Sequence, residues 1–222
     1  FVPYKTIGVS IDERYATLYD GFITAARDFS EIIDSTRIGF FGHSFGGGAT
    51  PAISFETFIE NKWGANGKFI YCSAPWYSYQ LGDSSLAKFP ADCKMITILY
   101  DDDNVNDHRM GMDIFNHIAI NDSNKDCLIA YSDTIDNYIY EANHNLPGQY
   151  TPESEFDALD YYVTFRLLDA IADYTFTGNS DARKIALGNG EDEQVNLAPE
   201  FKALYENDRP FPIYPQSKYK WK

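Results

Sequence analysis

The sequence has few cysteines, few basic side chains and no long apolar run, and each shortage excludes a class of protein. Three cysteines, Cys72, Cys93 and Cys127, are too few for a disulfide scaffold and lack the spacing of a metal site. They are compatible with one bridge plus a free thiol, and equally with three thiols. No apolar stretch reaches the roughly 20 residues that a membrane-spanning helix needs. We therefore expect no membrane span.

Basic residues are also scarce relative to acidic ones: 18 Lys and Arg face 33 Asp and Glu, for a net charge of −15. This excess repels phosphate groups, so neither nucleic acid nor an anionic membrane is an expected partner. The chain begins with Phe1 rather than Met, and no signal peptide is visible. We expect a processed or truncated form, or one piece of a longer polypeptide.

Strand and helix patterns alternate along the 222 residues, of which 44% are hydrophobic. Strands are predicted over 4–11, 37–41, 68–73, 94–100 and 127–131, and helices over 15–33, 46–59, 107–120 and a long stretch with Thr151 as N-cap and Pro152 as first helical residue. Nearly continuous apolar strands predict a doubly wound, mostly parallel α/β sheet, covered on both faces. We expect one domain over 1–222, with its core at about 4–175 and a C-terminal extension over 178–222, irregular apart from a short strand or helix.

The most informative motif follows the strand predicted over 37–41. It is the pentapeptide Gly42-His43-Ser44-Phe45-Gly46, which leads into a glycine-rich helix start. This pattern predicts a sharp strand–turn–helix with Ser44 at a strained apex, where small residues two before and two after the serine allow close approach. Ser44 is therefore a candidate nucleophile. The alternatives are an ordinary serine in a glycine-rich turn, or a phosphate-binding loop, although no Gly-Lys-Ser/Thr follows.

A serine nucleophile needs a base, and the base needs an acid to orient it. The strand over 94–100 ends in an acidic loop, 101–107, where the fold would put the acid. Asp103 is the preferred acid and Asp102 the reserve. Asn106 and Asp107 are candidate helix caps, and the loop does not have the spacing of an EF-hand.

His144 is the preferred base, because it lies in a loop after the last strand and completes the order Ser, Asp, His. His43 adjoins the nucleophile and cannot easily fold back onto it. His108 and His117 lie on the helix after the acidic loop, where surface or packing roles are expected.

The oxyanion hole needs two backbone N–H donors. The first is expected from Phe45, the residue after the nucleophile. The second normally comes from a loop between an earlier strand and helix. We expect it from a segment preceding Phe1 or from a second chain.

The segments 4–12 and 34–48, the run Ser73-Ala74-Pro75-Trp76 and the acid loop Asp103-Asn104-Val105 together resemble the α/β-hydrolase superfamily. The likeness is greatest to its dienelactone-hydrolase-like and cutinase-like polyester-hydrolase (lipase and esterase) branch, and it covers about 4–147. Phe45 stands where the polyester hydrolases have Met. The resemblance implies that Phe45 and Trp76 flank the acyl or aromatic part of an ester, and that the protein is secreted or periplasmic. Without the resemblance, Trp76 is equally an ordinary core or surface aromatic.

These observations predict a serine hydrolase that cleaves small-molecule or polymeric carboxylic esters through Ser44, His144 and Asp103. Neither a cofactor nor a metal is expected. A serine peptidase or amidase of the same fold is the alternative enzyme, and a non-catalytic binding module with an α/β-hydrolase-like fold is the alternative outside enzymes.

Overall fold

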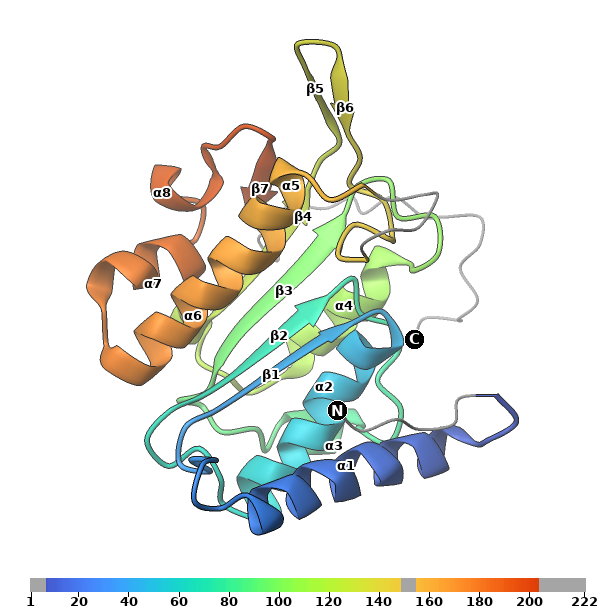
Figure 1. Ribbon diagram of the computed structural model, residues 1–222, viewed down its shortest axis with the longest axis vertical. Coiled ribbons are helices and arrows are strands. Elements are labelled where there is room, and N and C mark those ends of the chain that lie inside the picture. The colour runs from blue at the N-terminus through green and yellow to red at the C-terminus, as the bar shows by residue number, and fades with distance from the viewer. Residues whose placement is uncertain (1–6, 149–154, 204–222) are drawn as a thin grey trace.

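A computed structural model of the chain describes residues 7–148 and 155–203 (Figure 1). Its main sheet has the strand order β1-β2-β3-β4-β7, in which the first four strands are parallel and β7 pairs antiparallel with β4. The strands are β1 (Ile38–His43), β2 (Lys68–Ser73), β3 (Lys94–Tyr100), β4 (Lys125–Ala130) and β7 (Phe201–Ala203). The predicted mostly parallel α/β architecture is confirmed.

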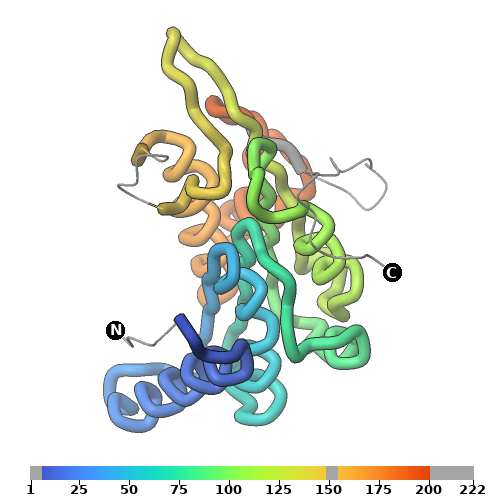
Figure 2. The backbone as a smooth tube through the Cα atoms, turned by 90° about the vertical axis from the view of Figure 1, so that its right-hand side faces the viewer, coloured from blue at the N-terminus to red at the C-terminus, as the bar shows by residue number. Residues whose placement is uncertain are grey.

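Helices cover both faces of the sheet, and Figure 2 shows α4 and α6 on opposite sides of it. One hydrophobic cluster lies between the sheet and the side formed by α1 (Ile11–Asp28), α2 (Phe45–Phe55), α3 (Asp83–Leu86) and α4 (His108–His117). The other lies under α5 (Ala158–Asp160), α6 (Arg166–Thr177) and α7 (Ser180–Ala186). The central strands β2, β3 and β4 are almost wholly buried, as expected for parallel strands between two helical layers.

The described chain also contains three short helical segments and a hairpin. Two are π-helical turns, Glu56–Glu60 after α2 and Tyr161–Phe165 before α6, and the third is a 3-10 turn at Asp122–Asn124. The hairpin of β5 (Asp133–Ile135) and β6 (Tyr138–Tyr140) turns at Asp136 and Asn137, which both have positive φ. It projects beyond the main sheet (Figure 1) and leads directly into the loop that carries His144.

The N-terminal prediction is wrong in the part that the structure describes. Instead of continuing a strand over 4–11, the chain turns at Gly8 and begins α1 at Ile11. The cause is a capping box: Glu13 N–H donates to the Ser10 hydroxyl, and the Glu13 carboxylate accepts from Ser10 N–H. Residues 4–6 lie outside the described range. The helix predicted over 15–33 also ends earlier, at Asp28.

Two C-terminal predictions also need correction. The last long helix starts at Ala158 with Asp157 as its N-cap, whereas Thr151 and Pro152 lie outside the described residues. The extension beyond 178 is more regular than predicted, with α7, α8 (Asp192–Val195) and β7 in its described part. Buried Asp126 on β4 anchors it by accepting hydrogen bonds from Asn189 N–H and the Gln194 side-chain amide. A sequence pattern with little period thus conceals a packed segment.

The three cysteines are free and buried, so the structure contains no bridge between them. Burial raises the pKa of the Cys72 thiol to about 12, and it raises those of Cys93 and Cys127 as well. None of the helices described is long and apolar enough to cross a membrane.

Candidate active site

Ser44 lies at the junction of β1 and α2 and has φ 55° and ψ −119°. This is the strained backbone that the pentapeptide predicts. Three backbone hydrogen bonds hold the serine there. Its N–H donates to Ser73 C=O at 3.0 Å, and its C=O accepts from Gly48 N–H at 3.0 Å and from Trp76 N–H at 2.8 Å. The turn is therefore fixed by β2 and by the loop after it.

The glycines around Ser44 have unequal roles. A Cβ on Gly42 would lie 2.2 Å from Gly46 O and 2.4 Å from the Thr50 hydroxyl oxygen, so strand and helix approach too closely for a side chain. A Cβ on Gly46 would meet nothing within 4 Å, so the prediction that this position must be small for close approach is wrong. Gly47 and Gly48 take that role, because a Cβ on Gly47 would lie 2.8 Å from Ser73 O and one on Gly48 would lie 2.4 Å from Trp76 O.

This difference gives a matched test of the turn. We expect Gly42→Ala to destabilise the protein by about 3 kcal/mol or more, because backbone and a helical threonine must shift. Gly46→Ala should be neutral or stabilising by up to about 1 kcal/mol, since it adds a methyl group in open space and restricts the unfolded chain. Urea unfolding of both variants measures the two free energies. Equal losses would contradict the close approach at Gly42.

His144 lies in the loop after β6 and contacts both other predicted residues. Its Nε2 is 2.9 Å from Ser44 Oγ, and its Nδ1 is 2.9 Å from Asp103 Oδ2. His144 is 8% exposed and Asp103 is 1% exposed, so water competes little for these bonds. With the proton on Nδ1 donated to Asp103, Nε2 is free to accept the serine proton.

Asp103, not Asp102, contacts the imidazole. The other oxygen of Asp103 accepts the backbone N–H groups of Val105 and Asn106, both at 2.8 Å, which fixes the carboxylate at the end of β3. Asp102 instead contacts the segments on either side of the β5–β6 hairpin. Its N–H donates to Ala142 C=O in the loop that carries His144, and its carboxylate accepts from the Ser132 hydroxyl. Asp103 therefore contacts the His144 ring, whereas Asp102 contacts the loop that carries it.

The remaining histidines make structural contacts. The His108 ring is buried, with Nε2 at 2.7 Å from Tyr100 O, and burial lowers its pKa. His117 is more exposed, and its Nδ1 lies 2.7 Å from Asp113 O. His43 faces the His144 backbone, a contact that motif analysis missed because nothing in the pentapeptide indicates a partner so distant in the chain. Of the two candidate caps, Asp107 is the N-cap of α4.

Phe45 is the first residue of α2, where a backbone N–H has no acceptor within the helix. Its ring contacts Tyr15 at 5.7 Å and Tyr79 at 6.5 Å between centroids, and the Arg14 guanidinium lies 5.3 Å from its centre. Trp76 is partly exposed and donates its indole N–H to the Tyr79 hydroxyl at 3.2 Å. An aromatic wall thus adjoins Ser44 on the α1 side.

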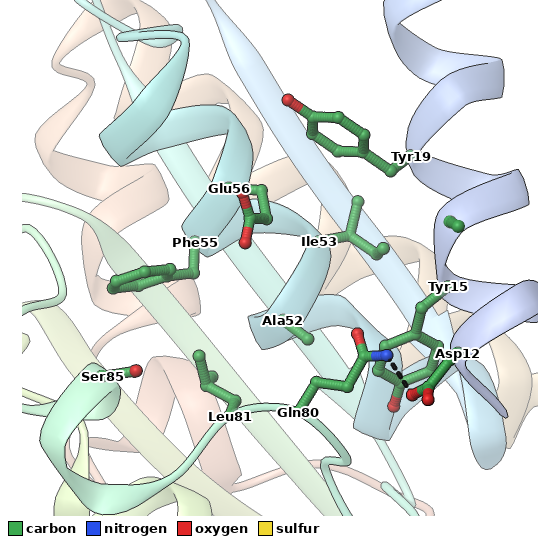
Figure 3. Close-up of a pocket in the computed structure, with 11 residues that line it drawn as sticks. Asp12, Tyr15, Tyr19, Ala52, Ile53, Phe55, Glu56, Gln80, Leu81 and Ser85 are labelled. Carbon is green, nitrogen blue, oxygen red and sulfur yellow. Dashed lines mark hydrogen bonds between the residues drawn. The ribbon is translucent and has the colours of Figure 1, made fainter.

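A cavity of about 400 Å³ lies behind this wall, between α1, α2 and the loop before α3 (Figure 3). Its floor includes Ala52, Ile53 and Leu81, and Asp12 accepts a hydrogen bond from Gln80 at its edge. The residues that line it include Tyr15, whose ring contacts Phe45, but not Ser44, Asp103 or His144. It is therefore distinct from the space in front of Ser44.

A second hollow, of about 450 Å³, is formed by the loop after β3 and the loop after β6 that carries His144. Asp101, Asp102 and Glu141 give it a negative charge, and Asn104 and Asn143 complete it. Burial, and then the charge of Asp102, raise the pKa of Asp101. The charged hollow makes this side of the site unfavourable for anions.

Comparison of the chain with protein-family models and with curated proteins found no match in either set.

Proposed function

We propose that the chain is a serine hydrolase of the α/β-hydrolase superfamily, and that it cleaves carboxylic esters. The observation that carries the proposal is the unbroken hydrogen-bonded series Ser44–His144–Asp103, with both links at 2.9 Å. Ser44 follows β1, Asp103 follows β3 and His144 follows β6. The chain order Ser, Asp, His is that of α/β-hydrolases. A serine–imidazole–carboxylate series, in which the histidine and the aspartate are buried, activates a serine hydroxyl.

The proposed reaction begins when Ser44 Oγ attacks the ester carbonyl while His144 Nε2 takes the hydroxyl proton. Asp103 holds the imidazole in the required tautomer and stabilises the imidazolium that forms. The Phe45 N–H donates to the developing oxyanion at the start of α2. The tetrahedral intermediate expels the alcohol, to which His144 returns the proton. Water then attacks the acyl-enzyme by the same route, releasing the acid and the free serine.

The surroundings of the site favour uncharged esters. The acidic hollow formed by Asp101, Asp102 and Glu141 would repel an anionic group on that side. Phe45, Trp76 and Tyr79 offer aromatic surface on the other side. We therefore propose that Phe45 and Trp76 flank an acyl or aromatic part of the substrate, as the resemblance to cutinase-like polyester hydrolases implies. Small and polymeric esters both fit this description.

Fluorophosphonate labelling followed by a substrate panel tests the proposal. We expect stoichiometric labelling, with the modified peptide containing Ser44, because a fluorophosphonate reacts with a serine that a neighbouring base activates. p-Nitrophenyl acetate and butyrate should be hydrolysed, and an ester bearing a carboxylate should be a poorer substrate. Protein labelled beforehand is the control and should not hydrolyse any ester.

The same panel includes peptide anilides, which separate an esterase from a peptidase or amidase. Anilide cleavage at the ester rate would assign the chain to the peptidases. A folded protein that neither takes the label nor hydrolyses any member of the panel would be a binding module, and the proposed function would fail.

A further inference from the structure

His43 has no part in the reaction as described, although it lies between Gly42 and the proposed nucleophile. It ends β1, where its ring is partly exposed. Its Nε2 is 2.8 Å from the backbone carbonyl oxygen of His144, and the two imidazole rings lie 4.8 Å apart between centroids at an angle of 42°. The residue before the nucleophile therefore holds the residue that activates it.

The contact fixes which nitrogen of the His43 ring carries a proton. A carbonyl oxygen only accepts, so Nε2 must carry the proton and donate it. Burial, followed by the positive charge that His144 can carry, lowers the pKa of His43 to about 4, although the hydrogen bond to the His144 carbonyl and the charge of Asp103 act in the opposite direction. Near neutral pH the ring is therefore an uncharged donor. A charged ring at this distance would oppose the His144 imidazolium of the reaction.

The hydrogen bond supplies a restraint that the two side-chain contacts of His144 do not. The hydrogen bonds to Asp103 and Ser44 orient the imidazole ring of His144, but they do not hold its backbone. The loop that carries His144 follows the projecting hairpin β5–β6 (Figure 1). Asp102 anchors this loop at Ala142 from the β3 side. His43 anchors it at the histidine itself, from the β1 side.

We propose that His43 is a positioning residue, which holds the His144 backbone at the distance where Nε2 meets Ser44 Oγ. The proposal rests on the proposed function of the triad. It assigns His43 no contact with substrate. A displacement of about 1 Å between reacting groups can lower the rate by about 100-fold. The loss of one hydrogen bond to the His144 backbone should therefore lower the rate of acylation.

Two amide variants test the role of the hydrogen bond. In His43→Gln the side-chain amide reaches approximately to the place of Nε2 and can donate to the same carbonyl. In His43→Asn an amide of the same chemistry is one methylene too short. Fluorophosphonate inactivation separates the maximal rate of reaction with Ser44 from the affinity for the reagent. We expect His43→Asn to lower the maximal rate by about 10- to 100-fold with unchanged affinity, and His43→Gln to retain most of the rate.

A merely structural role for His43 would give a different result. The fraction of protein labelled at saturation would then fall, or the melting temperature would drop in both variants, while the labelled fraction reacted at the wild-type rate. Either that outcome or equal rates in the two variants would overturn the positioning role. A wild-type protein that takes no label would instead reject the proposed function, so the two failures are distinguishable.

Discussion

Replacing Ser44 by alanine should abolish fluorophosphonate labelling and lower ester hydrolysis by about 10⁶-fold in kcat. The reason is that His144 Nε2 and the Phe45 N–H would remain, but no nucleophile would stand 2.9 Å from the base. The residual rate would come from water and from the remaining oxyanion donor. Burst-phase kinetics with a p-nitrophenyl ester checks the prediction, since the burst that reports the acyl-enzyme should disappear.

The variant should stay folded, because the Ser44 side chain makes no capping hydrogen bond to α2 and its strained backbone is held by main-chain contacts. Ser54→Ala is the matched control. This buried serine is on the same helix and donates to Thr50 C=O, so its loss removes a hydroxyl without touching the triad. Labelling that persisted in Ser44→Ala would identify another nucleophile and sink the proposed mechanism.

The strained turn at Ser44 and its contacts with Asp103 and His144 could be predicted in outline, because local sequence patterns indicate them. An apolar run followed by glycines around a serine encodes a strand–turn–helix, and parallel strands bring their carboxyl ends to one edge. Asp103 and His144 could then be found by chain order. Of the two candidate acids, Asp103 is the one that contacts His144, and the amides of Val105 and Asn106 hold its carboxylate in that orientation.

The wrong predictions have a common physical origin. In each, a contact that the local hydrophobic pattern does not show determines the structure. Ile7, Val9 and Ile11 alternate like a strand, yet the capping box of Ser10 and Glu13 starts a helix there. Gly48 needs to be small because the Trp76 carbonyl lies against it, and that contact comes from the next strand's loop. The described tail beyond 178 shows little hydrophobic period in its sequence, and its regular structure is anchored by a residue far away on β4, Asp126.

Replacing Asp103 by asparagine should lower kcat by about 10³- to 10⁴-fold while leaving the fold intact. Val105 and Asn106 N–H groups both need an oxygen, so the asparagine carbonyl should stay on their side. The amide NH₂ would then face His144 Nδ1 and donate to it. That arrangement stabilises the tautomer with the proton on Nε2, which cannot accept the serine proton. Steady-state kinetics, with the acylation rate measured by fluorophosphonate, checks the prediction.

Asp102→Asn is the matched control, since it makes the same change one residue away. The asparagine oxygen can still accept from the Ser132 hydroxyl, and the main-chain bond to Ala142 is unaffected. We expect its kcat to stay within about tenfold of wild type, because only the anchor of the base loop is weakened. If Asp102→Asn were the more damaging change, the acid would have to be reassigned to Asp102. Equal and small losses in both variants would mean that His144 needs no carboxylate, and the triad would reduce to a serine–histidine pair.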